Sequence, residues 1–309
     1  MIDRKGIYPK SSGWVGRILA KIPARTPILY PLYLARQLYR RTWEFRTPEL
    51  PPAFSGMRVV FLSDIHYGEF LDNDRVCKLI ERVNAENADV ILLGGDYGEE
   101  GQATLRFWQN TTACFRAREG VFGVLGNHDV IHSSFLPSIM EAMKERGVML
   151  LSNQARYLER EGERIAIGGL EECYTGSPDM DTVERLCSGV PFVLLLSHSP
   201  DVLPDYIDTL PEEKQPFYHL FLCGHTHGGQ IAIRGRALHS SSVYGNRYST
   251  GMKEERGTAE LISPGIGTSF LPVRMGTRPG YEVITLFSAL KWELKKTGEE
   301  NTAAVTEKP

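Results

Sequence analysis

Short apolar runs alternate with longer amphipathic segments along the first half of the chain. A short apolar run is typical of a buried strand, and apolar residues recurring at helical spacing are typical of a helix packed on one face. These patterns predict three strands, over 57–63, 89–93 and 120–125, and three helices, over 73–87, 103–118 and 134–146. Because strands and helices alternate, we expect an α/β fold built on a parallel sheet.

The pattern changes after about residue 150, where the apolar segments become shorter and the helical spacing weakens. Six further strands are predicted, over 155–159, 164–170, 192–196, 218–223, 259–262 and 281–287. Since the long helices of the first half are absent from this part, we expect these strands to form a second sheet that packs on the first.

The N-terminal arm, residues 1–47, is basic: ten Lys and Arg residues face two acidic ones, a net charge of +8. The whole chain carries −3, so the remaining residues carry −11. Within the arm, Pro31 can start a helix that runs to about Phe45 with an apolar and a basic face. Such a helix would lie on an anionic membrane or pack on the acidic body, and both alternatives stay open. A nucleic-acid partner is not expected, because the arm has no recognisable reading motif.

The segments around the central domain are assigned by composition. Three prolines predict a linker over 48–56, which places the globular domain at 57–290, and the tail over 291–309 has no periodic apolar face and is predicted to be disordered. No apolar run reaches the ~20 residues that a membrane-spanning helix needs. Five cysteines without paired spacing favour a reducing compartment. We therefore expect a cytoplasmic protein, held at the inner face of the membrane if the arm binds lipid.

Polar residues with metal-binding chemistry follow five of the predicted strands. Ligands gather at the carboxyl ends of parallel strands, and carboxylate, imidazole and amide groups are donors for divalent metals. The clusters are Asp64-Ile65-His66, Gly95-Asp96-Tyr97-Gly98-Glu99, Gly126-Asn127-His128-Asp129, Ser197-His198 and Gly224-His225-Thr226-His227-Gly228. In the last cluster, the flanking glycines allow backbone angles that turn both rings toward one cavity.

The order of these motifs resembles the calcineurin-like metallophosphoesterase superfamily over nearly all of residues 57–288. The shared pattern is Asp-x-His, Gly-Asp-x-x-Glu, Gly-Asn-His-Asp, His and Gly-His-x-His. The resemblance implies a four-layer αββα double β-sandwich with two metal ions at the strand ends. It further implies that Asp64, His66 and His227 bind one ion, that Asn127, His198 and His225 bind the other, and that Asp96 bridges both.

The predicted activity is hydrolysis of a phosphodiester or pyrophosphate bond. Two divalent cations roughly 3.5–4 Å apart can generate hydroxide at neutral pH and clamp the phosphoryl oxygens. His128 is expected to protonate the leaving oxygen or to stabilise the transition state, with Asp129 orienting its ring. Mixed nitrogen and oxygen ligands favour manganese as the cofactor, with iron or zinc as alternatives.

The substrate is predicted from two further segments. Residues 224–230 and 265–274 resemble a bacterial branch that includes envelope-associated phosphodiesterases and a UDP-2,3-diacylglucosamine pyrophosphatase of lipid A synthesis. Together with the basic arm, this favours a lipid-linked substrate such as UDP-2,3-diacylglucosamine, with residues 132–137 and 244–248 as candidates for lining its pocket. The alternatives are a general nucleotide phosphodiesterase and a protein-binding scaffold with a decayed site, against which the full ligand set argues.

Overall fold

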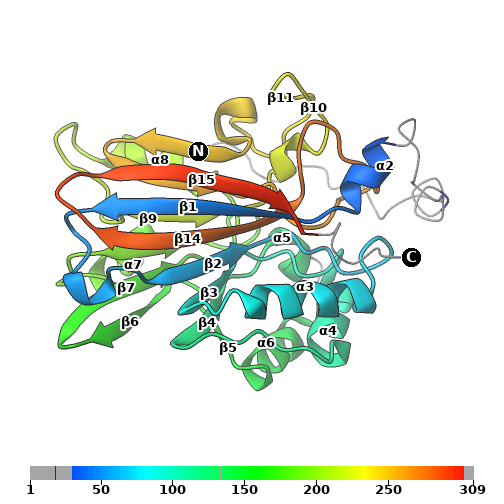
Figure 1. Ribbon diagram of the computed structural model, residues 1–309, viewed down its shortest axis with the longest axis horizontal. Helices are drawn as coiled ribbons and strands as arrows, with labels where there is room; N and C mark the ends of the chain where they lie inside the picture. Colours follow the sequence, from blue (N-terminus) through cyan, green and yellow to red (C-terminus); the bar gives the residue numbers. More distant parts are fainter. Residues whose placement is uncertain (1–17, 19–29, 132–133, 303–309) are drawn as a thin grey trace.

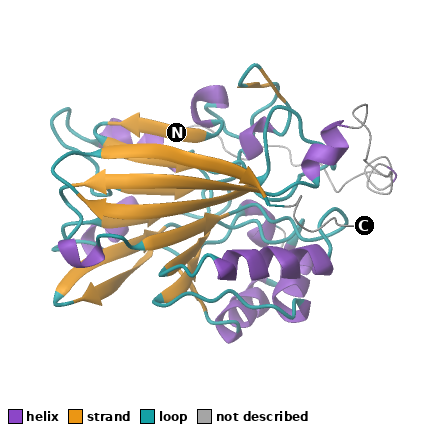
Figure 2. Cartoon of the chain, in the orientation of Figure 1, coloured by secondary structure: helices purple, strands orange, loops and turns teal. Residues whose placement is uncertain are grey.

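Two β-sheets lie face to face in the protein, with helices on their outer sides (Figure 1). The computed structural model describes residue 18, residues 30–131 and residues 134–302. Strands make up most of one end of the molecule, and long helices flank the first sheet toward the other end (Figure 2). Within the described residues, every helix is too short or too polar to cross a membrane.

The first sheet contains seven strands. Their order across the sheet is β15 (Glu293–Asn301), β1 (Tyr39–Thr47), β14 (Gly280–Ser288), β2 (Arg58–Leu62), β3 (Val90–Leu93), β4 (Gly120–Gly123) and β5 (Val148–Leu150). Strands β2 to β5 are parallel; β2, β3 and β4 correspond to the three predicted strands, and β5 was not predicted. The helices that cover this part of the sheet are α3 (Asn73–Ala85), α4 (Gly101–Asn110) and α6 (Leu136–Glu145).

The second sheet contains six strands. Their order is β12 (Gly251–Glu255), β13 (Thr258–Ile262), β9 (Leu220–Cys223), β8 (Val193–Leu196), β7 (Glu163–Gly169) and β6 (Gln154–Arg160). Helices α7 (Met180–Leu186) and α8 (Val202–Thr209) pack on its outer face. Among the described residues, the remaining elements are short: α2 (Tyr30–Ala35), α5 (Asn127–Val130), the 3₁₀ turns η2 (Pro52–Phe54), η3 (His227–Gly229) and η4 (Gly245–Tyr248), and the ribbon of β10 (Ala232–Ile233) and β11 (Arg236–Ala237).

Three apolar cores separate these layers. One lies between the two sheets, one between the first sheet and its helices, and one between the second sheet and its helices. Representative buried members are Phe61 and Leu222 in the first core, Ile80 and Ile139 in the second, and Val183 and Leu203 in the third. The order of layers is therefore helix, sheet, sheet, helix, which is the predicted αββα sandwich.

The helix predicted from Pro31 to Phe45 is wrong beyond Ala35, because β1 lies in the first sheet between β14 and β15 (Figure 1). Along β1 every second residue from Arg41 to Thr47 is buried, a period of two that suits a strand. Hydrogen bonding to strands on both sides then overrides the local helical pattern. This part of the arm packs on the body. Residues 1–17 and 19–29 lie outside the described part of the chain.

Charge pairing fixes β1 in place. Glu282 of β14 accepts hydrogen bonds from Arg41 Nη1 at 2.9 Å and from Trp43 Nε1 at 2.7 Å, and all three side chains are buried. Arg40 Nε lies 2.7 Å from Glu86 Oε1, beside the end of α3. Basic residues that suggested a membrane contact are thus partnered by acidic residues of the same protein.

The tail predicted to be disordered forms strand β15 up to Asn301. Its sequence lacks an apolar face, and Leu294 is its one buried residue, so the strand is specified by backbone pairing with β1 and by ion pairs. Glu299, for example, lies 3.3 Å from Arg41 Nε and 2.9 Å from Lys296 Nζ. Charged side chains on an edge strand also discourage pairing with another chain.

Three further boundaries differ from the predictions. The 281–287 strand is β14, which belongs to the first sheet and runs antiparallel to β2. The helix predicted over 103–118 ends at Asn110, where Thr111 and Thr112 lower the helix propensity. The predicted linker over 48–56 is packed, because Leu50 and Phe54 are buried in the core between the sheets.

Candidate metal centre

The five predicted clusters meet at one end of the sandwich, where β2, β3 and β4 of the first sheet and β8 and β9 of the second all end. Backbone hydrogen bonds tie the loops together: Asp64 N donates to Gly95 O at 2.9 Å, and Gly224 N donates to His198 O at 2.8 Å. The amide of His225 donates to Asp64 Oδ2 at 3.0 Å, which joins the loops of the two sheets.

Most of the candidate ligands have left-handed backbone angles. Asp64, His66, Asp96, His225 and His227 have φ values between 48° and 69°. Such values are uncommon for residues other than glycine, and they cluster at functional sites where the surrounding structure holds them. After a strand, a residue in this conformation turns the chain sharply, so its side chain lies beyond the end of the strand.

Glycines are required where the loops cross. A Cβ added at Gly224 would lie 2.1 Å from Ser63 Oγ and 2.2 Å from Asp64 Oδ2. A Cβ added at Gly126 would lie 2.1 Å from Asp96 Oδ1. Both contacts are far inside van der Waals distance, so any larger residue would displace a carboxylate of the centre.

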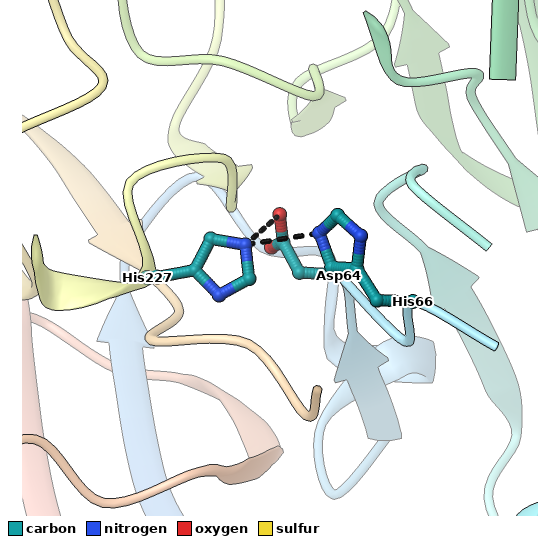
Figure 3. A group of neighbouring side chains, drawn as sticks. All are labelled: Asp64, His66 and His227. Atoms are coloured by element: carbon teal, nitrogen blue, oxygen red, sulfur yellow. Dashed lines mark hydrogen bonds and ion pairs between the residues drawn. The ribbon is translucent and has the colours of Figure 1, made fainter. Parts of the chain in front are cut away.

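Asp64, His66 and His227 form the first group of converging donor atoms. The loop after β2 carries Asp64 and His66, and the turn after β9 carries His227. Figure 3 shows the two rings facing one another beside the carboxylate, with the Nε2 atoms 3.0 Å apart and His227 Nε2 3.5 Å from Asp64 Oδ1. Converging lone pairs of this kind suit a cation placed between them.

Asp96, His198 and His225 form the second group. His198 Nε2 lies 3.3 Å from Asp96 Oδ2 and 3.2 Å from His225 Nδ1. Asn127 Oδ1 also lies 3.0 Å from His198 Nε2, which adds an amide oxygen to the group. The same Asp96 Oδ2 is 3.6 Å from His66 Nε2 of the first group, so Asp96 stands between the two.

Outer partners set the tautomers of two histidines. Nδ1 of His198 donates to Gly94 O at 2.7 Å, which leaves Nε2 as the nitrogen that faces the centre. Nε2 of His225 donates to the hydroxyl of Tyr174 at 2.8 Å, and that hydroxyl donates to Asp201 Oδ2 at 2.7 Å, so His225 turns the Nδ1 lone pair inward. A metal-ligating histidine characteristically has such a partner on its other nitrogen.

A buried arginine supports the third histidine. Arg274 has no exposed surface, and its guanidinium donates to the carbonyls of His227 at 3.2 Å, Pro264 at 2.6 Å and Gly267. Its Nη2 atom lies 3.1 Å from His227 Nδ1. Arg274 therefore joins the turn of His227 to the 264–267 loop, which in turn packs on Asp64.

His128 lies beside both groups, with a ring nitrogen close to donor atoms of His66 and Asp96. Its backbone amide donates to Asp96 Oδ1 at 2.9 Å, and its Nδ1 donates to the carbonyl of Glu99 at 2.8 Å. The hydrogen bond to Glu99 orients the ring and leaves Nε2 as the atom available to the centre.

Asp129 does not have the predicted role of orienting His128. Its buried carboxylate accepts hydrogen bonds from the amides of Asp96 at 2.8 Å, Tyr97 at 3.0 Å and Gly126 at 2.8 Å, and from the hydroxyl of Thr104 at 2.7 Å. These hydrogen bonds hold the Asp129 carboxylate against the loop after β3. Asp129 therefore fixes the loop that carries Asp96.

Burial and mutual charge set the protonation states. Burial lowers the pKa of His66 and of His225 to about 3 each, so both rings are neutral. Burial opposes the charge of Asp96, but the neighbouring histidines, His198 first, outweigh it and hold the pKa of Asp96 well below its usual range. Burial opposes the charge of His198 as well, but Asp96 outweighs it and raises the pKa of His198 to about 10, so this ring carries a proton that a bound cation would displace.

All seven predicted ligands lie within this centre. Tyr174, Asp201 and Arg274 were missed by the sequence reasoning. Tyr174 and Asp201 lie outside every motif, and only Asp201, three residues after His198, gave a positional signal. Arg274 lies within the segment over 265–274, which was noted only for its resemblance to a bacterial branch of the family.

The sequence model of the calcineurin-like phosphoesterase family matches residues 57–229, more than half of the chain. The chain belongs to this family. As a calcineurin-like phosphoesterase with its candidate ligands assembled, the protein is a metal-dependent phosphoester hydrolase that uses divalent cations.

Relatives of this calcineurin-like phosphoesterase occur in bacteria and animals. The uncharacterised metallophosphoesterase YkuE of Bacillus subtilis (strain 168) is 29% identical over 266 residues, which cover 84% of this chain and 89% of the relative. The phosphodiesterase YaeI of Escherichia coli (strain K12) is 26% identical and covers 74% of this chain and 82% of its own. A transmembrane protein with a metallophosphoesterase domain from Danio rerio is 25% identical over 80% of this chain, which spans only 56% of that protein.

Proposed function

We propose that the protein hydrolyses phosphodiester or pyrophosphate bonds at a centre of two divalent cations. The observation that carries this proposal is the position of Asp96 between two separate groups of donor atoms. Asp64, His66 and His227 would hold one cation, Asn127, His198 and His225 the other, and Asp96 both. When bound, the two cations would polarise the phosphoryl oxygens and activate water for attack.

His128 is the proposed proton donor to the leaving oxygen. The Glu99 carbonyl holds the proton on Nδ1, so Nε2 is the nitrogen that can exchange a proton with substrate. The Asp129 carboxylate contributes indirectly, because it holds the amides of Asp96 and Gly126 and so fixes the positions of Asp96 and the His128 helix turn.

Manganese is the proposed cation, because the mixture of imidazole, carboxylate and amide donors suits manganese, iron or zinc better than magnesium alone. The test is turnover of bis(p-nitrophenyl) phosphate by metal-free protein to which each cation is returned separately. Activity that returns with manganese supports the proposal. A folded protein that takes up no cation and hydrolyses nothing would favour the alternative of a protein-binding scaffold.

A lipid-linked substrate, with UDP-2,3-diacylglucosamine as the leading candidate, is the proposed refinement. Its support is an apolar surface: Tyr30 and Tyr33 of α2 are exposed, as are Phe270 and Leu271 of the adjoining loop. The two segments are joined by a hydrogen bond of 2.9 Å from Arg274 N to Pro31 O. Exposed aromatic and aliphatic side chains beside the centre would contact acyl chains, and would place the protein at the inner face of the membrane.

The refinement is tested by comparing UDP-2,3-diacylglucosamine with its deacylated analogue under identical metal conditions. Faster turnover of the acylated substrate supports it, and equal turnover removes the lipid argument. Preference for a nucleotide diester without acyl chains would favour the general nucleotide phosphodiesterase instead. Sedimentation with anionic vesicles, before and after deletion of residues 1–29, separately tests whether the basic segment binds membrane. Such binding is expected to weaken as the salt concentration rises.

A further inference from the structure

The ribbon of β10 and β11 forms a sheet of its own, toward the end of the molecule that carries α2 (Figure 1). Its strands are joined by the two residues Arg234 and Gly235, whose φ values are 50° and 78°. Positive φ at both central positions is characteristic of a type I′ turn, which closes a tight hairpin. The turn therefore presents Arg234, which is exposed, at the tip of the hairpin.

The inner face of the ribbon packs on the turn that carries His227. Side chains alternate between the two faces of a strand, and the facing pair Ala232 and Ala237 is buried. A Cβ added at Gly229 would lie 2.2 Å from Ala237 Cβ, so the contact leaves room only for small side chains. Gly229 belongs to the same turn as His227, one of the candidate ligands. The ribbon is therefore attached directly to a part of the metal centre.

The outer face of the ribbon is aliphatic and basic. Ile233 pairs with Arg236, and Leu238 lies two residues beyond Arg236, so the alternation places all three on this face. Ile233 is 51% exposed and Leu238 is 67% exposed, and Arg234 and Arg236 are exposed as well. These four residues, Ile233, Arg234, Arg236 and Leu238, form the ribbon face.

Two neighbouring segments extend the apolar part of this surface. Ala232 N donates to Met275 O at 2.7 Å, and Arg274 N donates to Pro31 O at 2.9 Å, so the ribbon, the loop over 267–276 and α2 are joined in series. Single exposed apolar residues are normal on a protein surface, but three joined segments that each expose two large ones indicate an interaction site. The exposed residues are Ile233 and Leu238 of the ribbon face, Phe270 and Leu271 of the loop, and Tyr30 and Tyr33 of α2.

The charge of these segments has one sign. Residues 214–253, which include the ribbon, contain five Lys and Arg and no Asp or Glu, and residues 261–281, which include the loop, contain two Arg and no acidic residue. Residues 48–309 as a whole carry −11, so the ribbon is a basic region on an acidic body. The cavity beside α2 that Glu69 and Asp72 line also contains two arginines, so the charges there balance. An anionic surface is therefore the electrostatic complement of the ribbon face.

We propose that the ribbon face docks on an anionic membrane. Ile233 and Leu238 enter the boundary between headgroups and acyl chains, and the two arginines contact lipid phosphates. Aliphatic side chains flanked by arginine suit this boundary, because the arginine stem lies along the apolar layer while its guanidinium stays among the headgroups. A nucleic acid offers the same negative charge but no apolar layer for Ile233 and Leu238. The proposal rests on the proposed function for its purpose, since docking brings a lipid phosphoester to the centre, but the binding itself needs no substrate.

Sedimentation of the full chain with vesicles tests the proposal. Vesicles of equal parts phosphatidylglycerol and phosphatidylcholine supply the anionic surface, and vesicles of phosphatidylcholine alone are the neutral comparison. We expect wild-type protein to prefer the anionic vesicles at low salt and to bind them less as salt rises, because exposed charges are screened. Equal binding to both kinds of vesicle would overturn the proposal. Protein that stays in the supernatant would also overturn it, and would leave the ribbon face to a protein or nucleic-acid partner.

Variants locate the contact. Arg234→Gln combined with Arg236→Gln should lower the partition coefficient for anionic vesicles by about tenfold or more, because each basic side chain beside such a surface contributes roughly fivefold. Leu238→Ser should lower the coefficient by about fivefold or more, because it removes an aliphatic contact. The matched control, Leu290→Ser combined with Lys291→Gln, changes exposed residues in the turn between β14 and β15, at the opposite end of the molecule from α2 (Figure 1), and should match wild type. An unchanged coefficient in either ribbon variant, or an equal loss in the control, would overturn the proposal.

The fold and the proposed function are measured separately on the same proteins. Urea unfolding should show the variants to be as stable as wild type, because the replaced side chains are exposed, and Ile233→Ser takes the place of Leu238→Ser if the latter unfolds earlier. Turnover of soluble bis(p-nitrophenyl) phosphate should be unchanged in all of them. Wild-type protein that binds vesicles but hydrolyses nothing with metal added would refute the proposed function and leave the docking in place. Turnover without vesicle binding would overturn only the docking.

Discussion

Removing one hydroxyl group behind His225 should weaken one metal position and spare the other. Tyr174→Phe deletes the oxygen that accepts a hydrogen bond from His225 Nε2 at 2.8 Å and passes its own proton to Asp201 Oδ2 at 2.7 Å. Without that acceptor, the tautomer whose Nδ1 lone pair faces His198 is favoured only by the backbone carbonyl of Ser241, to which the ring also hydrogen-bonds. The ring remains in place, but its protonation pattern is less strongly selected for metal binding.

The size of the effect follows from the geometry. Loss of an outer partner of a metal-ligating histidine typically lowers metal affinity 10- to 100-fold, or about 1.4–2.7 kcal/mol. The lower part of this range is expected, because the Ser241 carbonyl still hydrogen-bonds the His225 ring after the hydroxyl is removed. His66 and His227 belong to the other group of donor atoms, so affinity at their position should stay within about threefold, since removed interactions matter mainly to groups that share a partner.

Competition between the protein and a metal indicator dye measures both affinities in one titration. Two binding steps that separate in Tyr174→Phe, with one step unchanged, agree with the reasoning. Equal weakening of both steps, or no weakening, would refute it. Tyr157→Phe is the matched control: it removes a hydroxyl that donates to Leu186 O at the far side of the second sheet, and both steps should match wild type.

The remaining predictions concern other buried groups. Burial raises the pKa of Glu260 to about 9, far above its value in the unfolded chain. Between these two pKa values the folded state keeps a proton that the unfolded state has lost. The free energy of unfolding therefore falls by about 1.4 kcal/mol for each unit of rising pH. Glu260→Gln should remove that slope in urea unfolding at pH 6 and pH 8; an identical slope in both proteins contradicts the assignment. His128→Ala should retain both cations by elemental analysis and lose about 10²–10⁴-fold in kcat, and loss of metal would mean that His128 is a ligand. Arg274→Lys should lower metal affinity at the His227 position by about tenfold or more, because lysine cannot bridge the His227, Pro264 and Gly267 carbonyls, whereas unchanged binding would leave Arg274 with a purely structural role.

The candidate ligands could be predicted because their signals are local. Each lies in a polar cluster that follows a short apolar strand. The order of these clusters carries the family resemblance, and that resemblance implies the individual ligands. The left-handed backbone angles of Asp64 and His66 could not be read from the sequence, because neither residue type requires them. These angles arise where loops that are far apart in the chain pass close to one another. Gly126 and Gly224 were the only indication of this in the sequence.

Prediction failed where partners distant in sequence decide the local structure. Residues 39–47 carry both helical and alternating patterns, and only pairing with β14 and β15 selects the strand. Strand β15 itself has almost no apolar residues that would predict a strand. Its stability comes from that pairing and from ion pairs such as Arg41–Glu299. The role of Tyr174 and Asp201 could not be predicted for the same reason, because their link to His225 exists only after the second sheet has formed.

Asp96 at the junction of two metal positions is the central claim, and anomalous diffraction from crystals of the manganese-loaded protein tests it most directly. Two manganese peaks are expected, roughly 3.5–4 Å apart as in other two-metal sites. One should lie within coordinating distance of His66 and His227, the other of His198 and His225, with the Asp96 carboxylate contacting both. A single peak, or two peaks that do not share Asp96, would contradict the account.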